Sequence, residues 1–305
     1  MKKIISLLLA GTMLISTMVA MSGCGSETTN EPTDADTETQ GTTYADVDLD
    51  ELMENYPKDI NYDDEHEVGY QLEKPQDGEQ IAILHTSMGD ITMRLFPENA
   101  PNTVTNFVEL AKSGAYDNVP FHRVIDDFMI QTGDITNGDG TGGKTYNGEI
   151  LYDEFCDKLF NIRGSVAMAN SGRDTNGSQF FINQTKPEAL SDWSSLKASW
   201  EYMYEGICSY YNTDSFIAFV AYYGSNLFNP DLLSDEVKAL YEANGGNPHL
   251  DGYYNYVDRG HTVFAQVIDG MDIVDAIAGV EVDDSSKPTT EVLIKTVEIT
   301  TYNAG

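Results

Sequence analysis

Short stretches in which apolar and polar residues alternate predict that most of the chain folds as β-strands. Residues 81–86 and 91–95 alternate in this way around the turn Ser87-Met88-Gly89-Asp90, which predicts a hairpin. Further strand-like runs are separated by loops rich in Gly, Asn and Asp, and they lie at 121–125, 128–131, 164–169, 179–182, 263–268 and 292–300.

Two segments repeat apolar residues every three or four positions, which predicts helices. In 102–112 these residues fall on one face and Gly114 follows them, and 271–277 ends in the same way before Gly279. Many short strands with a helix near each end predict a mainly β fold. We expect a closed antiparallel barrel with two flanking helices, because closure leaves no unpaired strand edge.

Residues 185–246 break this rhythm because aromatic residues are far more frequent there than elsewhere. Within them, 234–241 begins with a serine suited to capping a helix. A structureless loop of this length inside a compact domain would be unusual. We therefore predict a largely helical, aromatic-rich insertion that packs against the barrel.

The first 23 residues predict a signal peptide. Lys2 and Lys3 precede an apolar run, and Met21-Ser22-Gly23-Cys24 resembles the lipobox of a bacterial lipoprotein. The resemblance implies that Cys24 is acylated and anchors an extracytoplasmic protein to the cell membrane. A plain secretory signal with an incidental cysteine is the alternative, and the apolar run lies at the lower length limit for a spanning helix.

Residues 24–77 are acidic and poor in apolar side chains, which predicts a disordered tether. The acidic cluster 63–67 contains His66 and could be taken for a metal site, but a solvated linker is the simpler interpretation. The remaining residues, 78–303, form the predicted folded domain.

The charge of the chain excludes several classes of partner. Seventeen Lys and Arg residues against fifty Asp and Glu residues give a net charge of −33. Such a surface repels phosphate backbones and anionic headgroups, so we expect no nucleic acid and no docking to membranes through basic residues. Three cysteines are too few for a disulfide scaffold and lack zinc-ligand spacing, so no metal or cofactor is expected.

Several motifs occur in one order along the chain. Phe121-His122-Arg123-Val124-Ile125 precedes Phe128-Met129-Ile130-Gln131-Thr132-Gly133-Asp134, and a glycine-rich loop covers 139–144. Met168-Ala169-Asn170-Ser171-Gly172 and 175–182 follow, and His249-Leu250-Asp251-Gly252 and 260–264 close the series. Together these motifs resemble the cyclophilin family of peptidyl-prolyl cis-trans isomerases. The resemblance implies a cyclophilin-like barrel that binds proline-containing polypeptides and accelerates rotation about Xaa–Pro bonds in secreted or surface proteins.

The resemblance also implies which residues form the site. The catalytic residues would be Arg123, Phe128, Gln131 and His261. The substrate-binding residues would be His122, Met129, Gly140, Ala169, Asn170, Ser171, Gln179, Phe181, His249 and Leu250. The chemistry is reasonable, because a guanidinium stays charged and presents several donors to an amide nitrogen that regains its lone pair as the bond twists.

Other interpretations of these residues stay open at this point. Arg123 could be a surface arginine in an ion pair, His122 a structural histidine, and Phe128 and Phe181 ordinary core residues. The chain could also be an inactive module that binds clients through the barrel and the insertion.

Three features depart from a simple match. His249 occupies a position that is often Trp in the family, and the insertion at 185–246 enters immediately before this part of the site. Ten residues, 251–260, separate Leu250 from His261, where the family has only a few, which suggests a displaced wall of the proline pocket.

The literal phosphate-loop pattern at 138–145 is rejected, because the residues after it are a poor start for a helix. We therefore expect no nucleotide binding.

Overall fold

The computed structural model describes residues 60–199, 201–202, 230–254 and 260–304. The predicted signal peptide, Cys24, most of the predicted tether, and Cys208 in the insertion lie outside the described residues. Within the described part of the chain, no helix is both long enough and apolar enough to span a bilayer.

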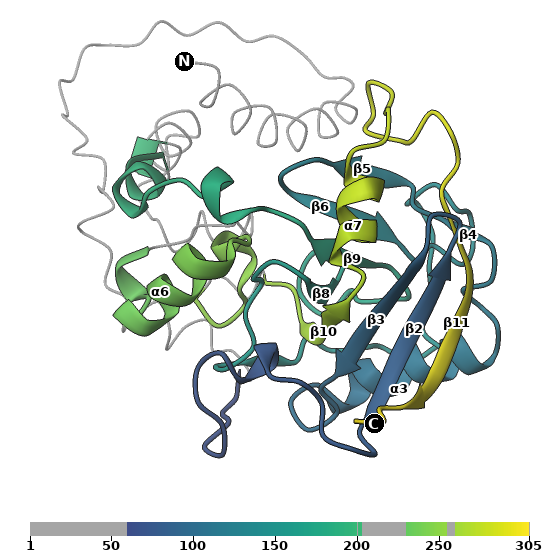
Figure 1. The fold of residues 1–305 in the computed structure, drawn as a ribbon, viewed down its shortest axis with the longest axis horizontal. Helices are drawn as coiled ribbons and strands as arrows, with labels where there is room; N and C mark the ends of the chain where they lie inside the picture. The colour runs from purple at the N-terminus through teal and green to yellow at the C-terminus, as the bar shows by residue number, and fades with distance from the viewer. Residues whose placement is uncertain (1–59, 200, 203–229, 255–259, 305) are drawn as a thin grey trace, which may run out of the picture. The chain divides into compact units, whose positions relative to one another are not determined.

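Nine strands form one curled antiparallel sheet in the order β4-β11-β2-β3-β10-β8-β9-β6-β5 (Figure 1). Their bounds are β2 Gln80–Thr86, β3 Asp90–Leu95, β4 Val119–Pro120, β5 Arg123–Ile125, β6 Met129–Thr132, β8 Ser165–Met168, β9 Phe180–Asn183, β10 Val263–Asp269 and β11 Leu293–Thr301. Each strand expected from alternation is present. Strand pairing ends at β4 and β5, so it gives a curled sheet, and the closed barrel stays a prediction.

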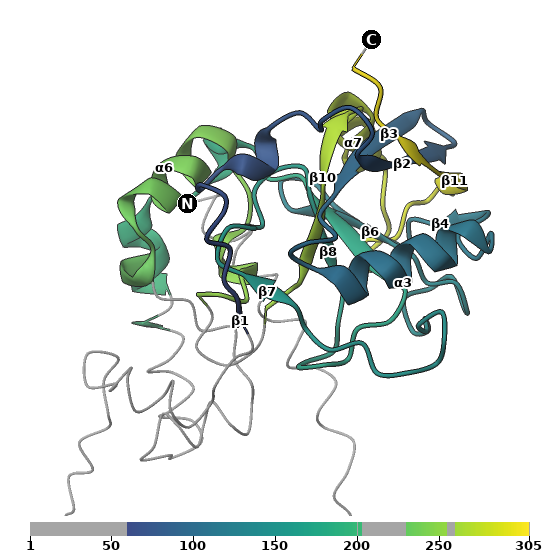
Figure 2. The same ribbon diagram turned by 90° about the horizontal axis from the view of Figure 1, so that it is seen from below.

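The two predicted flanking helices are α3, Pro101–Lys112, and α7, Met271–Ala278. They lie on opposite sides of the central strands (Figure 2). The apolar face of α3 is buried in the main core, where Phe107 lies edge-on to Phe180 at 5.6 Å. Glu154 caps α3, because its carboxylate accepts the backbone N–H of Asn102 at 3.1 Å and of Thr103 at 2.8 Å.

The described parts of the insertion are mainly helical. They comprise η3 Pro187–Ala189, a helical stretch at 193–199, η4 Pro230–Leu232 and α6 Asp235–Asn244. Ser234 caps α6 as expected, since its hydroxyl accepts the N–H of Val237. The helix buries Val237 and Tyr241 against Phe160 in a core cluster of its own. In both views α6 lies on the side of the domain away from β2 and β11 (Figures 1 and 2).

The prediction that the tether extends to residue 77 is wrong for its last part. Strand β1, Ile60–Asn61, pairs in parallel with β7, Phe155–Cys156, and the short helix η2, Tyr70–Leu72, packs on the domain. Gln71 is fully buried, where its amide donates to the carbonyl of Phe160 at 3.0 Å and accepts the N–H of the same residue at 2.8 Å. These partners are distant in sequence, so local composition does not reveal them.

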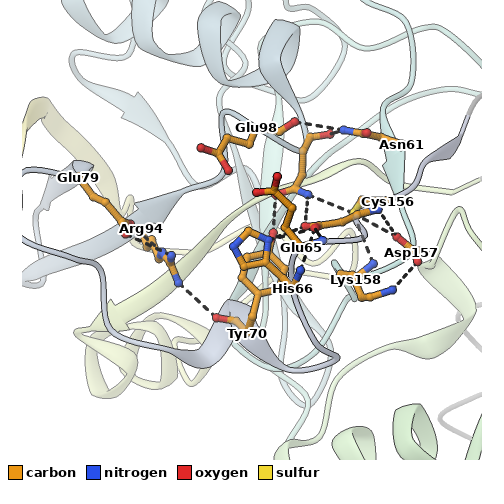
Figure 3. Close-up of polar contacts among 12 residues, drawn as sticks. Asn61, Glu65, His66, Tyr70, Glu79, Arg94, Glu98, Cys156, Asp157 and Lys158 are labelled. Atoms are coloured by element: carbon orange, nitrogen blue, oxygen red, sulfur yellow. Dashed lines mark hydrogen bonds and ion pairs between the residues drawn. The ribbon is translucent and has the colours of Figure 1, made fainter.

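The acidic cluster at 63–67 is not a solvated linker either (Figure 3). Asp63 is 9% exposed and accepts the Asn99 amide at 2.8 Å, and His66 Nδ1 lies 2.8 Å from its carboxylate. Tyr70 stacks on His66 and donates its hydroxyl to Asn99. Among the described residues, no group of three or more His, Cys, Asp or Glu side chains is arranged to hold a metal ion. The cluster therefore fastens residues 60–73 to the domain.

Candidate functional site

Arg123 and Gln131 face each other on the antiparallel hairpin of β5 and β6. They are direct cross-strand partners, and Arg123 Nη1 donates to Gln131 Oε1 at 3.5 Å. The Gln131 amide in turn donates to Gln179 Oε1 at 3.0 Å. Burial lowers the pKa of Arg123, but a guanidinium remains charged at neutral pH. The hairpin therefore holds a half-buried positive fork in a fixed position.

An apolar cluster contains the side chains predicted to form a proline socket. Met129, Phe181 and Leu250 are buried together, and the half-buried Phe128 and Ala169 pack against them. These residues come from four separate parts of the chain, and the sheet and the short helix η5, Pro248–Leu250, bring them together. Apolar side chains of this kind suit a small five-membered ring made mostly of CH₂ groups.

Two histidines border this cluster. His249 is half-buried and stacks on Phe128, with 6.1 Å between ring centroids and an interplanar angle of 13°. Burial, and the nearby His261, lower the pKa of His249 to about 4, so its ring is neutral at pH 7. The ring of His261 lies edge-on to Phe181 at 5.1 Å, and its Nδ1 is 2.8 Å from the carbonyl oxygen of Met168.

The long connection between Leu250 and His261 does not separate them. The backbone N–H of His261 donates to the carbonyl of Leu250 at 3.0 Å. Gly252 and Gly260 approach so closely that a Cβ on Gly260 would lie 1.9 Å from the Cα of Gly252. Positions 252 and 260 therefore lie side by side, which requires glycine at position 260, and Leu250 and His261 stay adjacent in the wall.

A polar cavity of about 180 Å³ adjoins Gln131. It is lined by Gly140, Thr141, Gly142, Gly143, Ala169, Asn170, Ser171, Thr175, Gly177, Ser178, Gln179 and Gln131. Six of the predicted site residues, from four segments, thus line one hollow. Gln179 closes its floor, because its amide donates to the carbonyls of Gly140 at 3.0 Å and Gly142 at 2.7 Å. Asn170 lies beside the connection between Leu250 and His261, where its amide donates to Gly260 O at 2.9 Å.

His122 lies beneath the glycine loop and is not part of the cavity lining. It is 6% exposed, and a Cβ on Gly140 would lie 2.8 Å from its ring. Burial lowers the pKa of His122, which keeps the ring neutral. The structure thus gives His122 a supporting position under Gly140, whereas we had expected it to bind substrate.

Asp134 has a structural role that the motifs did not indicate. It is 1% exposed, and its carboxylate accepts the backbone N–H groups of Thr136, Asn137, Gly140 and Gly142 at 2.9–3.0 Å. Burial alone would raise the pKa of Asp134, but these four donors outweigh it and lower the pKa to about 2. An aspartate directly before a loop rich in Gly, Asn and Asp was the available signal for this role.

Replacing Asp134 by Asn should destabilise the fold by about 2 kcal/mol at pH 7. The folded pKa is below the unfolded one, so the carboxylate stabilises the fold above about pH 4, and this contribution is lost as the pH falls toward 2. Denaturant unfolding of both proteins between pH 7 and pH 3 measures the difference. Asp126→Asn, at an exposed position, is the control. A difference between wild type and Asp134→Asn that is independent of pH would contradict the assignment.

Two further features concern Cys156 and the residues of the rejected phosphate-loop pattern. Cys156 is buried and carries a free thiol, and burial raises its pKa to about 11. Residues 143–150, which comprise the end of the rejected phosphate-loop pattern and the residues after it, contain no helix. The anion site that such a pattern needs is therefore not formed there.

Two comparisons with known proteins indicate the same family. The model of the family described as cyclophilin type peptidyl-prolyl cis-trans isomerase/CLD matches residues 81–299. A Staphylococcus aureus protein named a peptidyl-prolyl cis-trans isomerase is 39% identical over 225 residues, which cover 73% of this chain and 93% of that protein.

One further relative and one solved structure also match. A Streptococcus pyogenes protein named a bifunctional phosphatase/peptidyl-prolyl cis-trans isomerase is 39% identical over 224 residues, but the match spans only 39% of its length. A crystal structure of a Cryptosporidium parvum cyclophilin type isomerase is 25% identical, with a TM-score of 0.49, and covers 72% of this chain and 97% of that one. The family match and the near-complete match to the Staphylococcus protein, on a chain whose motif residues surround one site, show that it belongs to the cyclophilin-type peptidyl-prolyl cis-trans isomerase family.

Proposed function

We propose that this isomerase accelerates rotation about Xaa–Pro bonds by placing the Arg123 guanidinium beside an apolar pocket for the proline ring. The observation that carries this proposal is the position of Arg123, held by Gln131 on the hairpin that also supplies Phe128 and Met129. No covalent bond has to form or break. The enzyme has only to stabilise the twisted amide.

The physical problem is the partial double bond of the peptide. Rotation about it meets a barrier of roughly 18–20 kcal/mol and takes tens of seconds or more without a catalyst. In the twisted state the nitrogen regains its lone pair and can accept a hydrogen bond. A fixed guanidinium donor then stabilises the transition state more than the planar ground state, and each 1.36 kcal/mol of difference raises the rate about tenfold.

The remaining residues have separate proposed roles. Met129, Phe181 and Leu250 receive the pyrrolidine ring and exclude water, with Phe128 and His261 at the borders of the pocket. The cavity beside Gln131 accepts the residues that precede proline, and Asn170 and the backbone of Ala169 and Ser171 contact the extended peptide. His249 forms the rim through its stack on Phe128.

The alternative is a module that binds clients without isomerising them. Such a module would need the apolar cluster and the insertion, but it would have no use for a half-buried cation held by a glutamine. Burying a charge is costly unless it is paired or used. The hydrogen bonds from Arg123 to Gln131 and from Gln131 to Gln179 therefore favour the enzyme.

A protease-coupled assay on an Ala-Pro-containing peptide separates the two functions. The proposal predicts turnover that rises linearly with protein concentration, far above the uncatalysed rate. If the protein suppressed aggregation of an unfolded client and yet left the isomerisation rate at its uncatalysed value, the binding module would be the correct function.

We further propose that the curled sheet closes into a barrel through its own backbone. Residues 119–125 contain both outer strands, since β4 pairs with β11 and β5 pairs with β6. Between them, the N–H of Phe121 donates to Val292 O at 2.9 Å, and the N–H of His122 donates to Gln131 O at 3.1 Å. One continuous segment thus joins the two edges of the sheet. This connection supports a closed barrel beneath Arg123.

We also propose that the protein acts outside the cytoplasm as a lipoprotein anchored through Cys24, with secreted or surface proteins that contain proline as its clients. The support is the sequence pattern around Cys24. Two acyl chains, at about 0.8 kcal/mol per buried CH₂, suffice for stable attachment.

Labelling cells with radioactive palmitate tests the anchor. Wild type should carry the label and sediment with membranes, whereas Cys24→Ala should lose the label and most of the membrane-bound fraction. Cys156→Ala is the matched control, because that thiol is buried in the domain. An unlabelled wild-type protein would rule the anchor out.

A further inference from the structure

A chain of buried polar side chains begins in the insertion. Tyr241 of helix α6 is fully buried, and its hydroxyl donates to Asp251 Oδ2 at 2.5 Å. Asp251 is 2% exposed and directly follows Leu250, which forms a wall of the apolar cluster. The insertion is therefore one hydrogen bond away from the backbone that carries this wall.

The other carboxylate oxygen continues the chain toward the opposite wall. Asp251 Oδ1 accepts the backbone N–H of Asn161 at 2.7 Å and its amide at 3.0 Å. Asn183 then donates to Asn161 Oδ1 at 3.0 Å, and Asn247 donates to Asn183 Oδ1 at 2.7 Å. The Asn247 amide also donates to the carbonyl oxygen of Phe128 at 3.1 Å. The chain therefore ends on a second residue of the apolar cluster.

Backbone hydrogen bonds tie the same residues to η5. The N–H of Leu250 donates to Asn247 O at 2.9 Å, and the N–H of Asn247 donates to Asn161 O at 2.8 Å. The three asparagines are each at most 5% exposed. Buried polar networks in which the members satisfy one another hold a single arrangement, because any other leaves a donor or acceptor unpaired.

We propose that Asp251 and Tyr241 are positioning residues, through which the insertion sets the distance between Leu250 and Phe128 and so the fit of the proline ring. This inference rests on the proposed function. Neither residue belongs to the apolar cluster or lines the cavity beside Gln131, so both act through the residues that form the walls. Replacing either residue should therefore weaken substrate binding, whereas the Arg123 donor stays in place.

The Tyr241 hydroxyl and two N–H groups of Asn161 donate to the Asp251 carboxylate. Only the ionised carboxylate accepts all three hydrogen bonds without carrying a proton of its own. Burial raises the pKa of Asp251 to about 7, although the hydrogen bonds from Tyr241 and Asn161 lower it. The titratable groups that face it in the described part of the chain are the hydroxyls of Tyr241 and Tyr254. A change of charge at Asp251 near neutral pH therefore supplies a signal that can be followed at Leu250.

The first experiment measures the kinetics of Tyr241→Phe with an Ala-Pro-containing peptide. Loss of this bond should raise KM about two- to tenfold, with kcat within about twofold of wild type. Thr86→Val is the matched control, because Thr86 is 3% exposed and its hydroxyl donates to Gly89 O at 2.6 Å in the β2–β3 turn, outside the proposed site. It should leave KM unchanged. An unchanged KM in Tyr241→Phe, or the same rise in Thr86→Val, would overturn the inference.

The second experiment does not depend on activity. In wild type, the methyl NMR resonances of Leu250 should shift with pH around a midpoint near 7. His261 also lies beside Leu250, so Asp251→Asn is the comparison: this component of the shift should disappear in that variant. In Tyr241→Phe the midpoint should move to higher pH, because a donor to the carboxylate is gone. If the shifts persisted in Asp251→Asn, Asp251 would not position Leu250.

The two experiments separate failure of the inference from failure of the proposed function. A protein without turnover in which Leu250 still follows Asp251 would keep the coupling but refute the isomerase. An active protein in which neither KM nor the Leu250 resonances respond would refute the coupling alone.

Discussion

Replacing Arg123 by Ala is expected to lower kcat/KM for a prolyl peptide about tenfold or more, with the fold unchanged. A hydrogen bond to a charged group contributes about 1.5–3 kcal/mol, and 1.36 kcal/mol corresponds to tenfold in rate. The loss should fall mainly on kcat, because the bond to the prolyl nitrogen forms only when the amide twists. A protease-coupled assay together with far-ultraviolet circular dichroism measures both quantities.

Two variants make this result specific. Arg123→Lys keeps the charge but loses the planar fork, so it should recover only part of the rate. Arg173→Ala removes an exposed arginine that pairs with its neighbour Asp174, and it should leave kcat within about twofold of wild type. Full turnover by a folded Arg123→Ala protein would remove the basis of the mechanism.

The second large effect concerns residues 60–77, which the family match at 81–299 leaves out. A chain that begins at residue 78 should be less stable than one that begins at residue 60 by about 3 kcal/mol or more. It loses a buried tyrosine, whose removal alone costs about 3–5 kcal/mol by analogy with other large aromatic side chains. It also leaves the buried backbone of Phe160 without its partner Gln71.

Thermal unfolding measures this loss as a fall in Tm of about 6–12 °C for a domain of this size. Tyr70→Ala should reproduce most of it. Tyr62→Ala, at a position that is 65% exposed in the same segment, should change stability by about 0.5 kcal/mol or less. Equal stability of the two truncated chains would mean that the segment contributes nothing to the domain.

Much of the fold could be predicted because its signals are local. Alternation around Gly89 predicted the β2–β3 hairpin, and the spacing of Val104 and Phe107 predicted the buried face of α3. The resemblance that the motifs carry then implied which distant residues meet, and Gln131, Asn170 and Gln179 do line one cavity. Such local patterns are readable in the sequence because each strand or helix must bury one face in the core.

The misses have a common physical cause, which is dependence on partners far away in sequence. Residues 60–77 look too polar to fold alone, and they fold because Gln71 and Asp63 find buried partners at Phe160 and Asn99. The long stretch after Leu250 suggested a displaced wall, but contact between two glycines closes it. Neither contact leaves a periodic trace in the sequence.

The most direct test of the central claim is the rate of cis-trans exchange in an Ala-Pro-containing peptide, measured by NMR with a small fraction of the protein present. Without protein the two isomers exchange over tens of seconds or more. The mechanism predicts exchange that becomes fast enough to give cross-peaks between the isomers, and that slows about tenfold or more with Arg123→Ala. Exchange at the uncatalysed rate, with the peptide bound at the apolar cluster, would contradict it.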